Sequence, residues 1–176
     1  KLQNCASVVV GTPDTSITGS EHTFLQQTIE GFNAYDLVGT TFTISFWVRS
    51  SVTGTYCIAL RNSGFDRSYI ATYTINAVDT WEYKTITVTG GLPASGGTWD
   101  FRNGAGLRVV WTLACGSTFH TTAGSWATGN FLGTSAQANF LATTNNTFQL
   151  TGVQLEAGSV ATPFEHRPYG AELALC

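Results

Sequence analysis

Hydrophobic and polar residues alternate along most of the chain with a period of two, the spacing that places successive side chains on opposite faces of a β-strand. The clearest example covers residues 41–49. One face of this predicted strand is hydrophobic and should face a core: Phe42, Ile44, Phe46 and Val48. The other face carries Thr43, Ser45, Trp47 and Arg49.

Other segments alternate in the same way and end at turn-forming residues, which predicts strands at 5–10, 23–29, 55–61, 68–75, 81–89, 107–115 and 147–155. Helical periodicity is almost absent, which excludes a parallel sheet because its crossovers need helices. The pattern predicts an all-β fold, a two-sheet antiparallel β-sandwich of the jelly-roll type. Residues 116–144 mix small residues with isolated aromatic rings, and we expect long loops with one or two short strands there.

The 176 residues fit a single domain, 1–176, because no linker or internal repeat divides the chain. Residues 157–176 differ in character, since two Xaa-Pro pairs, at 162–163 and 167–168, favour extended or turned backbone. We expect an extended C-terminal tail packed on the sandwich, with one short helical turn at 171–175. The chain starts without a charged-then-apolar leader, and we expect it to be a part of a longer polypeptide.

Charged residues make up only 11% of the chain, against an average of roughly 25%, and the net charge is −3. The basic residues do not cluster, so we expect no nucleic-acid partner. No apolar run approaches the roughly 18 residues of a membrane-spanning helix, so we expect no membrane insertion. The abundant hydroxyls and amides suit a β protein that works outside the cytosol or in a virion.

The four cysteines are Cys5, Cys57, Cys115 and Cys176, and their spacing matches neither a metal site nor a redox motif. Cys57 and Cys115 lie within apolar strand patterns and should be small buried thiols. The sequence leaves open whether Cys5 and Cys176 pair.

Two stretches resemble known families. Residues 42–50 (FTISFWVRS), followed later by residues 79–88 (DTWEYKTITV), resemble the strand layout of jelly-roll carbohydrate-binding modules of the galactose-binding-like class. Residues 150–176 (LTGVQLEAGSVATPFEHRPYGAELALC) closely resemble the closing segment of many phage tail-fibre and virion structural proteins. Together they imply a non-catalytic module on the extracellular-facing tail of a virion, which binds a cell-surface glycan and mediates host attachment.

The resemblance also bears on metal binding and assembly. Carbohydrate-binding jelly rolls of this class often carry acids in the final strand that help to hold a structural calcium, whereas Thr151 and Gly152 stand there in this chain. We therefore expect no metal and no other cofactor. Tail-fibre ends are commonly three-fold, and Phe164, Arg167 and Tyr169 in the tail need a docking surface, so we expect a homotrimer or one arm of a larger virion assembly.

Sugars present flat apolar faces and rings of hydroxyls, so a binding site needs exposed aromatic planes beside groups such as arginine. The strand faces offer these candidates: Trp47, Arg49, Arg61, Tyr69 and Tyr73. If their faces coincide, they form one platform, and the small Cys57 and Ala59 leave a shallow groove beside Arg61. The alternative is structural: a loop or the tail covers Trp47, and the arginines pair with Asp66 or Glu82.

The rim of the loops is a second candidate location, since loops there vary independently of the scaffold. Its aromatic residues are Trp99, Phe119, Trp126 and Phe131, and we count Trp126 among the ligand-binding candidates. Trp81 and Trp111 alternate with other hydrophobic residues and are predicted to be core.

We expect no enzymatic activity, because no histidine falls in a nucleophile or metal motif. Two alternatives to glycan binding remain at this stage. One is a structural or assembly domain of the virion that binds only protein. The other is a glycan hydrolase, for which two of the turn-borne acids could supply paired carboxylates.

Overall fold

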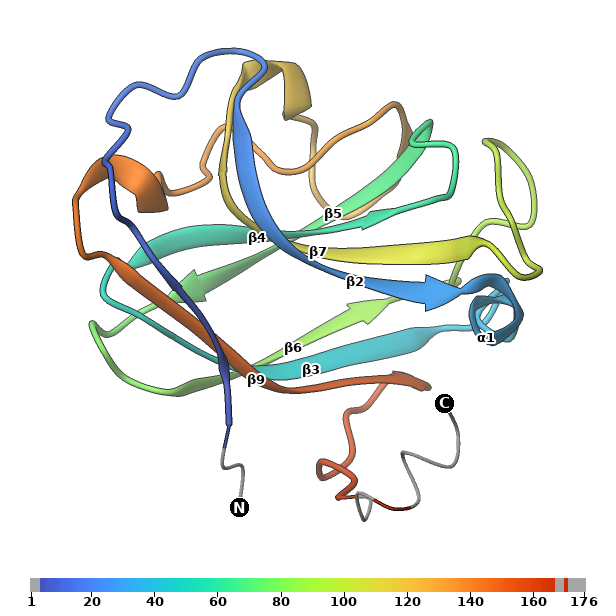
Figure 1. The fold of residues 1–176 in the computed structure, drawn as a ribbon. Coiled ribbons are helices and arrows are strands. Elements are labelled where there is room, and N and C mark those ends of the chain that lie inside the picture. The colour runs from blue at the N-terminus through green and yellow to red at the C-terminus, as the bar shows by residue number, and fades with distance from the viewer. Residues whose placement is uncertain (1–3, 167–169, 171–176) are drawn as a thin grey trace.

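The computed structural model describes residues 4–166 and 170, and it shows two antiparallel sheets packed face to face (Figure 1). The four-stranded sheet has the order β1 (Ala6–Val9), β9 (Thr147–Ala157), β3 (Phe42–Ser50) and β6 (Glu82–Val88). The five-stranded sheet has the order β2 (His22–Glu30), β7 (Ala105–Cys115), β4 (Gly54–Arg61), β5 (Arg67–Ile75) and β8 (Trp126–Thr128). The predicted all-β sandwich is therefore confirmed. No helix within the described residues is long and apolar enough to cross a membrane.

The main core lies between the sheets and is built from the inward positions of the central strands. The four inward residues of β3 are fully buried, as their alternation predicts: Phe42, Ile44, Phe46 and Val48. Phe46 meets Trp111 of β7 edge to face, with ring centroids 5.9 Å apart, so aromatic contacts join the two sheets. The core prediction for Trp111 is confirmed.

The core prediction for Trp81 is wrong, because the start of β6 faces the other way. Trp81 is exposed, and the inward positions at this end of β6 are taken by Glu82 and Lys84. These two side chains form an ion pair of 2.6 Å, and the Glu82 carboxylate also accepts hydrogen bonds from the backbone of Asn76 and Ala77. The paired charges can occupy the sandwich edge because each has its partner.

The segment from 116 to 144 covers the outer face of the five-stranded sheet. It contains two short helical turns, η1 (Ser117–Phe119) and η2 (Phe140–Ala142), and the three-residue β8, which fits the expected loops with a short strand. A second hydrophobic cluster forms beneath it from Cys57, Ala59, Ile70, Val110, Cys115 and Leu132, with Phe119 and Phe131 packed against it. The groove expected beside the small residues of β4 is therefore filled.

Both cysteines of this second cluster are buried, as expected, and neither forms a disulfide. Burial, with the neighbouring Cys57, raises the pKa of the Cys115 thiol to about 12. The thiolate that would react or bind a metal is therefore strongly disfavoured. A pairing of Cys5 with Cys176 falls outside the described residues.

A five-residue helix, α1 (Gly31–Tyr35), follows β2 and was not expected, because it is too short to show a helical period. It lies at the right-hand end of the sandwich in Figure 1. The Gly31 and Phe32 amides donate to the carbonyls of Gly104 and Arg102, so α1 is joined to the loop before β7. A Cβ atom on Gly31 would lie 2.3 Å from the Asp100 carbonyl, so only glycine permits this approach.

The described part of the tail, 158–166, folds back onto the outer face of the four-stranded sheet. The Thr43 hydroxyl donates to the Gly158 carbonyl at 2.8 Å, and the Thr162 amide donates to the Glu156 carboxylate at 2.6 Å. The Glu165 amide donates to the Gln154 side chain. The expected helical turn at 171–175 and the docking of Arg167 and Tyr169 lie outside the described residues.

The Gly31 contact leads to a stability prediction. We expect Gly31→Ala to lower the free energy of unfolding by about 2–3 kcal/mol, because the added methyl group overpacks the backbone of the Asp100 loop. Denaturant titration measures this change. Gly11→Ala is the matched control, since nothing lies within 4 Å of its added Cβ, and it should change stability by less than about 0.5 kcal/mol. Equal effects of the two substitutions would contradict the packing argument.

Candidate functional site

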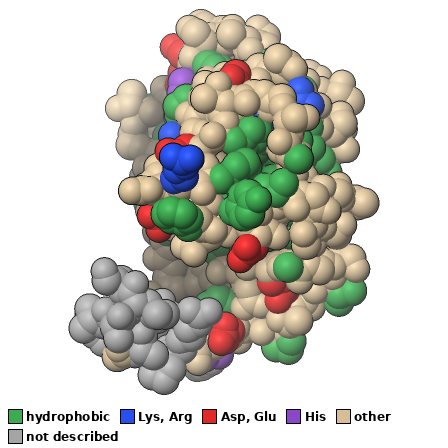
Figure 2. Space-filling view, turned by 90° about the vertical axis from the view of Figure 1, so that its right-hand side faces the viewer, with side chains coloured by type: hydrophobic (Ala, Val, Ile, Leu, Met, Phe, Trp, Pro, Cys, Tyr) green, Lys and Arg blue, Asp and Glu red, His purple; other side chains and the backbone are tan. Residues whose placement is uncertain are grey.

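Aromatic rings gather at the end of the sandwich where α1 meets the loop before β7, and we call this surface the rim cleft. It is lined by Phe32, Tyr35, Trp99, Phe101 and Arg102 and has a volume of about 510 Å³. Phe32 and Tyr35 are each 61% exposed, which is high for large hydrophobic rings. Figure 2 looks onto this end and shows hydrophobic side chains gathered at its centre.

The rings of the rim cleft stack on one another and continue into the sandwich. Trp99 and Phe101 are parallel, with centroids 5.4 Å apart and an interplanar angle of 6°. Tyr35 meets Phe101 edge on at 5.6 Å, and Trp126 meets Trp99 edge on at 5.6 Å. Trp126 in turn packs on Tyr69. Each ring is held by its neighbour, so the outer rings rest on a fixed base.

A small polar network around Asp66 holds the loop that carries Trp99. The Asp66 carboxylate accepts hydrogen bonds from the Asn62 side chain and from the amide and hydroxyl of Thr98. These donors, with Asn62 first, lower the pKa of Asp66 to about 2. The Asn62 side chain also donates to the Thr98 carbonyl, and Asn62 is fully buried. The loop position is therefore set by charge-assisted hydrogen bonds rather than by secondary structure.

The rim cleft offers a ligand apolar ring faces and one charged group. The Trp99 and Trp126 indole N–H groups donate to the Gly96 and Gly91 carbonyls, so these donors are already used. The Arg102 guanidinium makes no hydrogen bond or ion pair with any described residue and remains available for a ligand. Rings beside an unpaired arginine suit a ligand with a flat apolar face and oxygen atoms around its edge.

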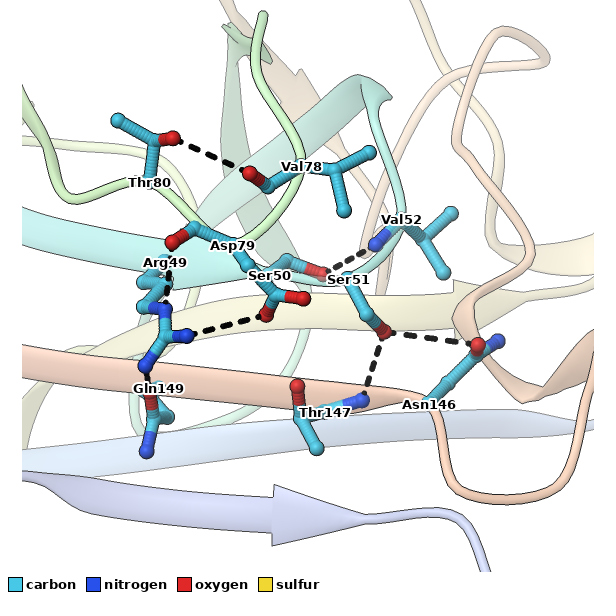
Figure 3. Close-up of polar contacts among 10 residues, drawn as sticks. All are labelled: Arg49, Ser50, Ser51, Val52, Val78, Asp79, Thr80, Asn146, Thr147 and Gln149. Carbon is cyan, nitrogen blue, oxygen red and sulfur yellow. Dashed lines mark hydrogen bonds and ion pairs between the residues drawn. The ribbon is translucent and has the colours of Figure 1, made fainter.

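The second aromatic surface lies on the outer face of the four-stranded sheet. Trp47 points outward and is 36% exposed, so the prediction for its face is confirmed and it is not second-layer core. It packs on the exposed Tyr83, with centroids 5.3 Å apart. Arg49 lies on the same face, but Figure 3 shows its guanidinium held between Asp79 and Gln149. Its Nε donates to the Asp79 carbonyl at 2.8 Å and its Nη1 to the Gln149 side chain at 3.2 Å.

Arg49 therefore has a structural role that its position on the strand does not reveal. It joins β9 to the turn that contains Asp79, a non-glycine residue with a φ of 52°. The guanidinium also lies 3.5 Å from the Asp79 carboxylate. The Asp79 amide donates to the carbonyl of Ser50, the last residue of β3, so the turn is attached to the end of β3 just before β6 begins. The strand face thus contributes rings, while its arginine is already engaged.

The predicted platform does not form, because its members belong to different sheets and faces. Trp47 and Arg49 lie on the four-stranded sheet, whereas Arg61 lies on the outer face of the five-stranded sheet and is 4% exposed. Tyr69 and Tyr73 are on the inner face of β5 and pack in the main core. Arg61 donates to Asn130 and Gln26 rather than to an acid. Whether any of these residues binds a ligand stays a prediction.

The four aromatic residues predicted for the loop rim also lie in two separate places. Trp99 and Trp126 come together beside the rim cleft, whereas Phe119 and Phe131 pack under the 116–144 segment. Sequence reasoning missed the most exposed members, Phe32 and Tyr35, since they lie on a helix that was not expected. Two short stretches of sequence contain the residues that line the rim cleft: Gly-Phe-Asn-Ala-Tyr at 31–35 and Trp-Asp-Phe-Arg at 99–102.

The described residues contain no group of three or more His, Cys, Asp or Glu side chains placed to hold a metal ion. Thr151, where the resemblance noted in the sequence implies an acid, donates its hydroxyl to the Asn4 carbonyl. The expectation of no structural calcium stays a prediction.

Comparisons with known proteins assign the chain to no family. No protein-family model matches the chain, and no curated protein is significantly similar in sequence. A solved structure described as "CBM4 structure and function" is similar over 90% of this chain and 77% of its own, with 14% identity and a TM-score of 0.47. CBM4 denotes a carbohydrate-binding module.

The Asp66 network leads to a pH prediction. Its folded pKa of about 2 lies below the unfolded value of roughly 3.9, so the carboxylate stabilises the fold above about pH 4 and loses this contribution as the pH falls toward 2. We expect Asp66→Asn to melt below the wild type at neutral pH, and the difference to narrow near about pH 2. Calorimetry at the two pH values tests this.

Asp36→Asn is the control, because the Asp36 side chain makes no hydrogen bond with any described residue. It should melt like the wild type at both pH values. A difference for Asp66→Asn that stays constant between neutral and acidic pH would show that the charge of Asp66 does not hold the loop.

Proposed function

We propose that the chain is a non-catalytic glycan-binding module and that the rim cleft is its binding site. The observation that supports this most is the pair of rings on α1, Phe32 and Tyr35, exposed beside the stacked Trp99 and Phe101. Contiguous exposed aromatic surface costs solubility and marks a place where a partner binds. Pyranose C–H faces stack on such rings, and the nearby Arg102 can donate to sugar oxygens.

We further propose that this module faces outward on a phage tail and mediates attachment to the host. Support for this comes from residues 150–176, which resemble the closing segment of phage tail-fibre proteins. The described part of that segment is ordered against the four-stranded sheet through Thr162 and Glu165. A sugar bound at one shallow cleft would have a Kd near the millimolar range, so attachment requires several copies.

The competing function is assembly, in which the rim cleft binds another virion protein. Phe32 and Tyr35 favour this reading equally, since exposed rings also anchor protein interfaces. The cleft is shallow and open, and among the described residues that line it Arg102 carries the charge. A glycan array with the intact chain separates the two functions, because an assembly surface would bind no glycan.

A substitution on the cleft tests the location of the site. We expect Tyr35→Ala to weaken binding of the best glycan from the array by about 1–2 kcal/mol, roughly 5- to 30-fold, through loss of a stacking plane. Its melting midpoint should change little, because Tyr35 is mostly exposed. Isothermal titration calorimetry measures the affinity.

Trp47→Ala is the matched control, since Trp47 is also an exposed ring but lies on the four-stranded sheet. It should leave the affinity unchanged. The opposite result, with Trp47→Ala weakening binding and Tyr35→Ala neutral, would move the site to the strand face. Cleavage of the bound glycan by the wild type would contradict a non-catalytic role.

Assembly into a trimer is a separate prediction. We expect light scattering at micromolar concentration to give a mass near three times the 18.8 kDa of the chain. Three linked sites would raise avidity for a cell surface by roughly 10²–10⁴ over a single site. A monomer, both for this chain and for the full-length protein, would contradict the proposal.

A further inference from the structure

Two arginines stand opposite each other on the outer face of the five-stranded sheet. Arg61 of β4 and Arg108 of β7 are direct cross-strand partners in the register of the pair. Both guanidinium groups lie against the ring of Phe65, with Cζ atoms 5.1 and 4.2 Å from its centroid. Like charges directly opposite each other weaken a strand pair, so this arrangement needs a compensating partner.

The described residues supply only neutral partners to these charges. Arg61 donates to the side chains of Asn130 and Gln26, each at 3.0 Å. Arg108 donates to the carbonyls of Asn62 and Ser63, at 2.7 and 3.1 Å. No carboxylate of a described residue lies within ion-pair distance of either guanidinium.

Three described acids, Asp66, Asp100 and Glu30, form no ion pair with the two arginines. Asp66 accepts from Asn62 and Thr98, and the Asp100 carboxylate accepts from the Arg102 amide. Glu30 ends β2 with no hydrogen bond or ion pair to either arginine. Burial and the charge of Arg108 lower the pKa of Arg61 to about 10, which leaves it charged at neutral pH.

Unused donors and a strained aromatic residue mark the same place. The Nε atom of Arg61 is buried and has no hydrogen-bond partner, although the residue is only 4% exposed. Phe65 has a φ of 56°, a conformation that a bulky residue rarely adopts, and it remains 41% exposed. Strain of this kind persists where a side chain must be held at a functional position.

We propose that Arg108 binds an oxyanion, a carboxylate or a sulfate ester, on the glycan ligand, with the buried Arg61 behind it adding positive charge and Phe65 stacking on the sugar ring that carries the oxyanion. This inference rests on the proposed function and names its ligand class as acidic glycans. A guanidinium group binds such anions through two-pronged hydrogen bonds. The bound anion supplies a counter-charge that the described residues do not provide.

Hydrogen bonds link Arg108 to the loop that carries the rings of the rim cleft. Arg108 donates to the Ser63 carbonyl, while the Ser63 hydroxyl accepts from the Asp100 amide. Asp100 lies between Trp99 and Phe101, the stacked pair of the cleft. We expect one oligosaccharide to place a neutral sugar in the cleft and an acidic sugar at Arg108.

The direct test uses small anions and the intact chain. We would titrate sodium sulfate, sodium glucuronate and glucose 6-sulfate at constant ionic strength, with chloride as background, and follow the arginine Nε–H signals by NMR. We expect saturable shifts at Arg61 and Arg108, with Kd values in the millimolar range. Arg108→Gln should weaken binding at least about tenfold, and Arg108→Lys should give an intermediate loss because lysine lacks the guanidinium fork.

Arg49→Gln is the control, because Arg49 lies on the four-stranded sheet and already pairs with Asp79. This variant should bind the anions like the wild type. Circular dichroism checks that each variant is folded. Arg108→Lys should disturb the fold least, because Arg108 is partly exposed and lysine keeps the charge. Absence of saturation in the wild type, or equal affinity in Arg108→Gln, would overturn the site. Binding of inorganic sulfate alone, with neither acidic sugar, would overturn its assignment to a glycan.

The glycan array separates failure of this inference from failure of the proposed function. Binding of neutral and acidic glycans with equal affinity, and equally in Arg108→Gln, would remove the oxyanion site and leave the rim cleft as a neutral-sugar site. Binding of no glycan at all would remove the proposed function, whatever the small anions do. We expect acidic glycans to be preferred, and this preference to disappear in Arg108→Gln but persist in Arg49→Gln.

Discussion

Most of both faces of the five-stranded sheet is covered, and this constraint limits where the molecule can meet a ligand. Its inner face packs on the four-stranded sheet through contacts such as Phe46 with Trp111. Its outer face lies beneath the 116–144 segment, where Leu132 fills the space over Cys57 and Ala59. The tail after Ala157 occupies part of the remaining sheet surface. Exposed rings are left mainly at the end of the sandwich and on the uncovered half of the four-stranded sheet.

Backbone contacts, rather than a core of its own, hold the rim cleft in place. Gly31 brings α1 against the loop before β7, and the Asp66 network fixes the same loop from its other side. The rings then stack from Tyr35 through Phe101 and Trp99 to Trp126. A preformed aromatic surface loses little conformational freedom when a ligand binds, which favours weak ligands such as sugars.

Two ion pairs form among the described residues, each between groups close together in the fold. Glu82 pairs with Lys84 at the edge of the core, and Arg49 meets Asp79 at the turn before β6. Arg61 and Arg108 differ, because among the described residues they contact neutral hydrogen-bond acceptors and the rings of Phe24 and Phe65. In a chain with 11% charged residues, two adjacent cations with no described acid within ion-pair distance depart from local neutrality.

The sequence by itself determined the strands and the side of each strand that faces inward where the alternation is unbroken. In β3 the alternation correctly predicted that Phe42, Ile44, Phe46 and Val48 face inward and that Trp47 faces outward, because a period of two is a local property of the chain. The same alternation predicted the wrong side for Trp81, because the Glu82–Lys84 ion pair allows charged residues to take the inward positions of β6.

Only the tertiary structure decided which strands share a sheet and which faces are covered. That is why Trp47 and Arg61 lie on different sheets, and why Tyr69 and Tyr73 face the core. The rim cleft joins α1 to a loop far along the chain, and the arginine pair depends on the register between β4 and β7. These are contacts between distant segments, and the alternation within a single strand carries no information about its partner.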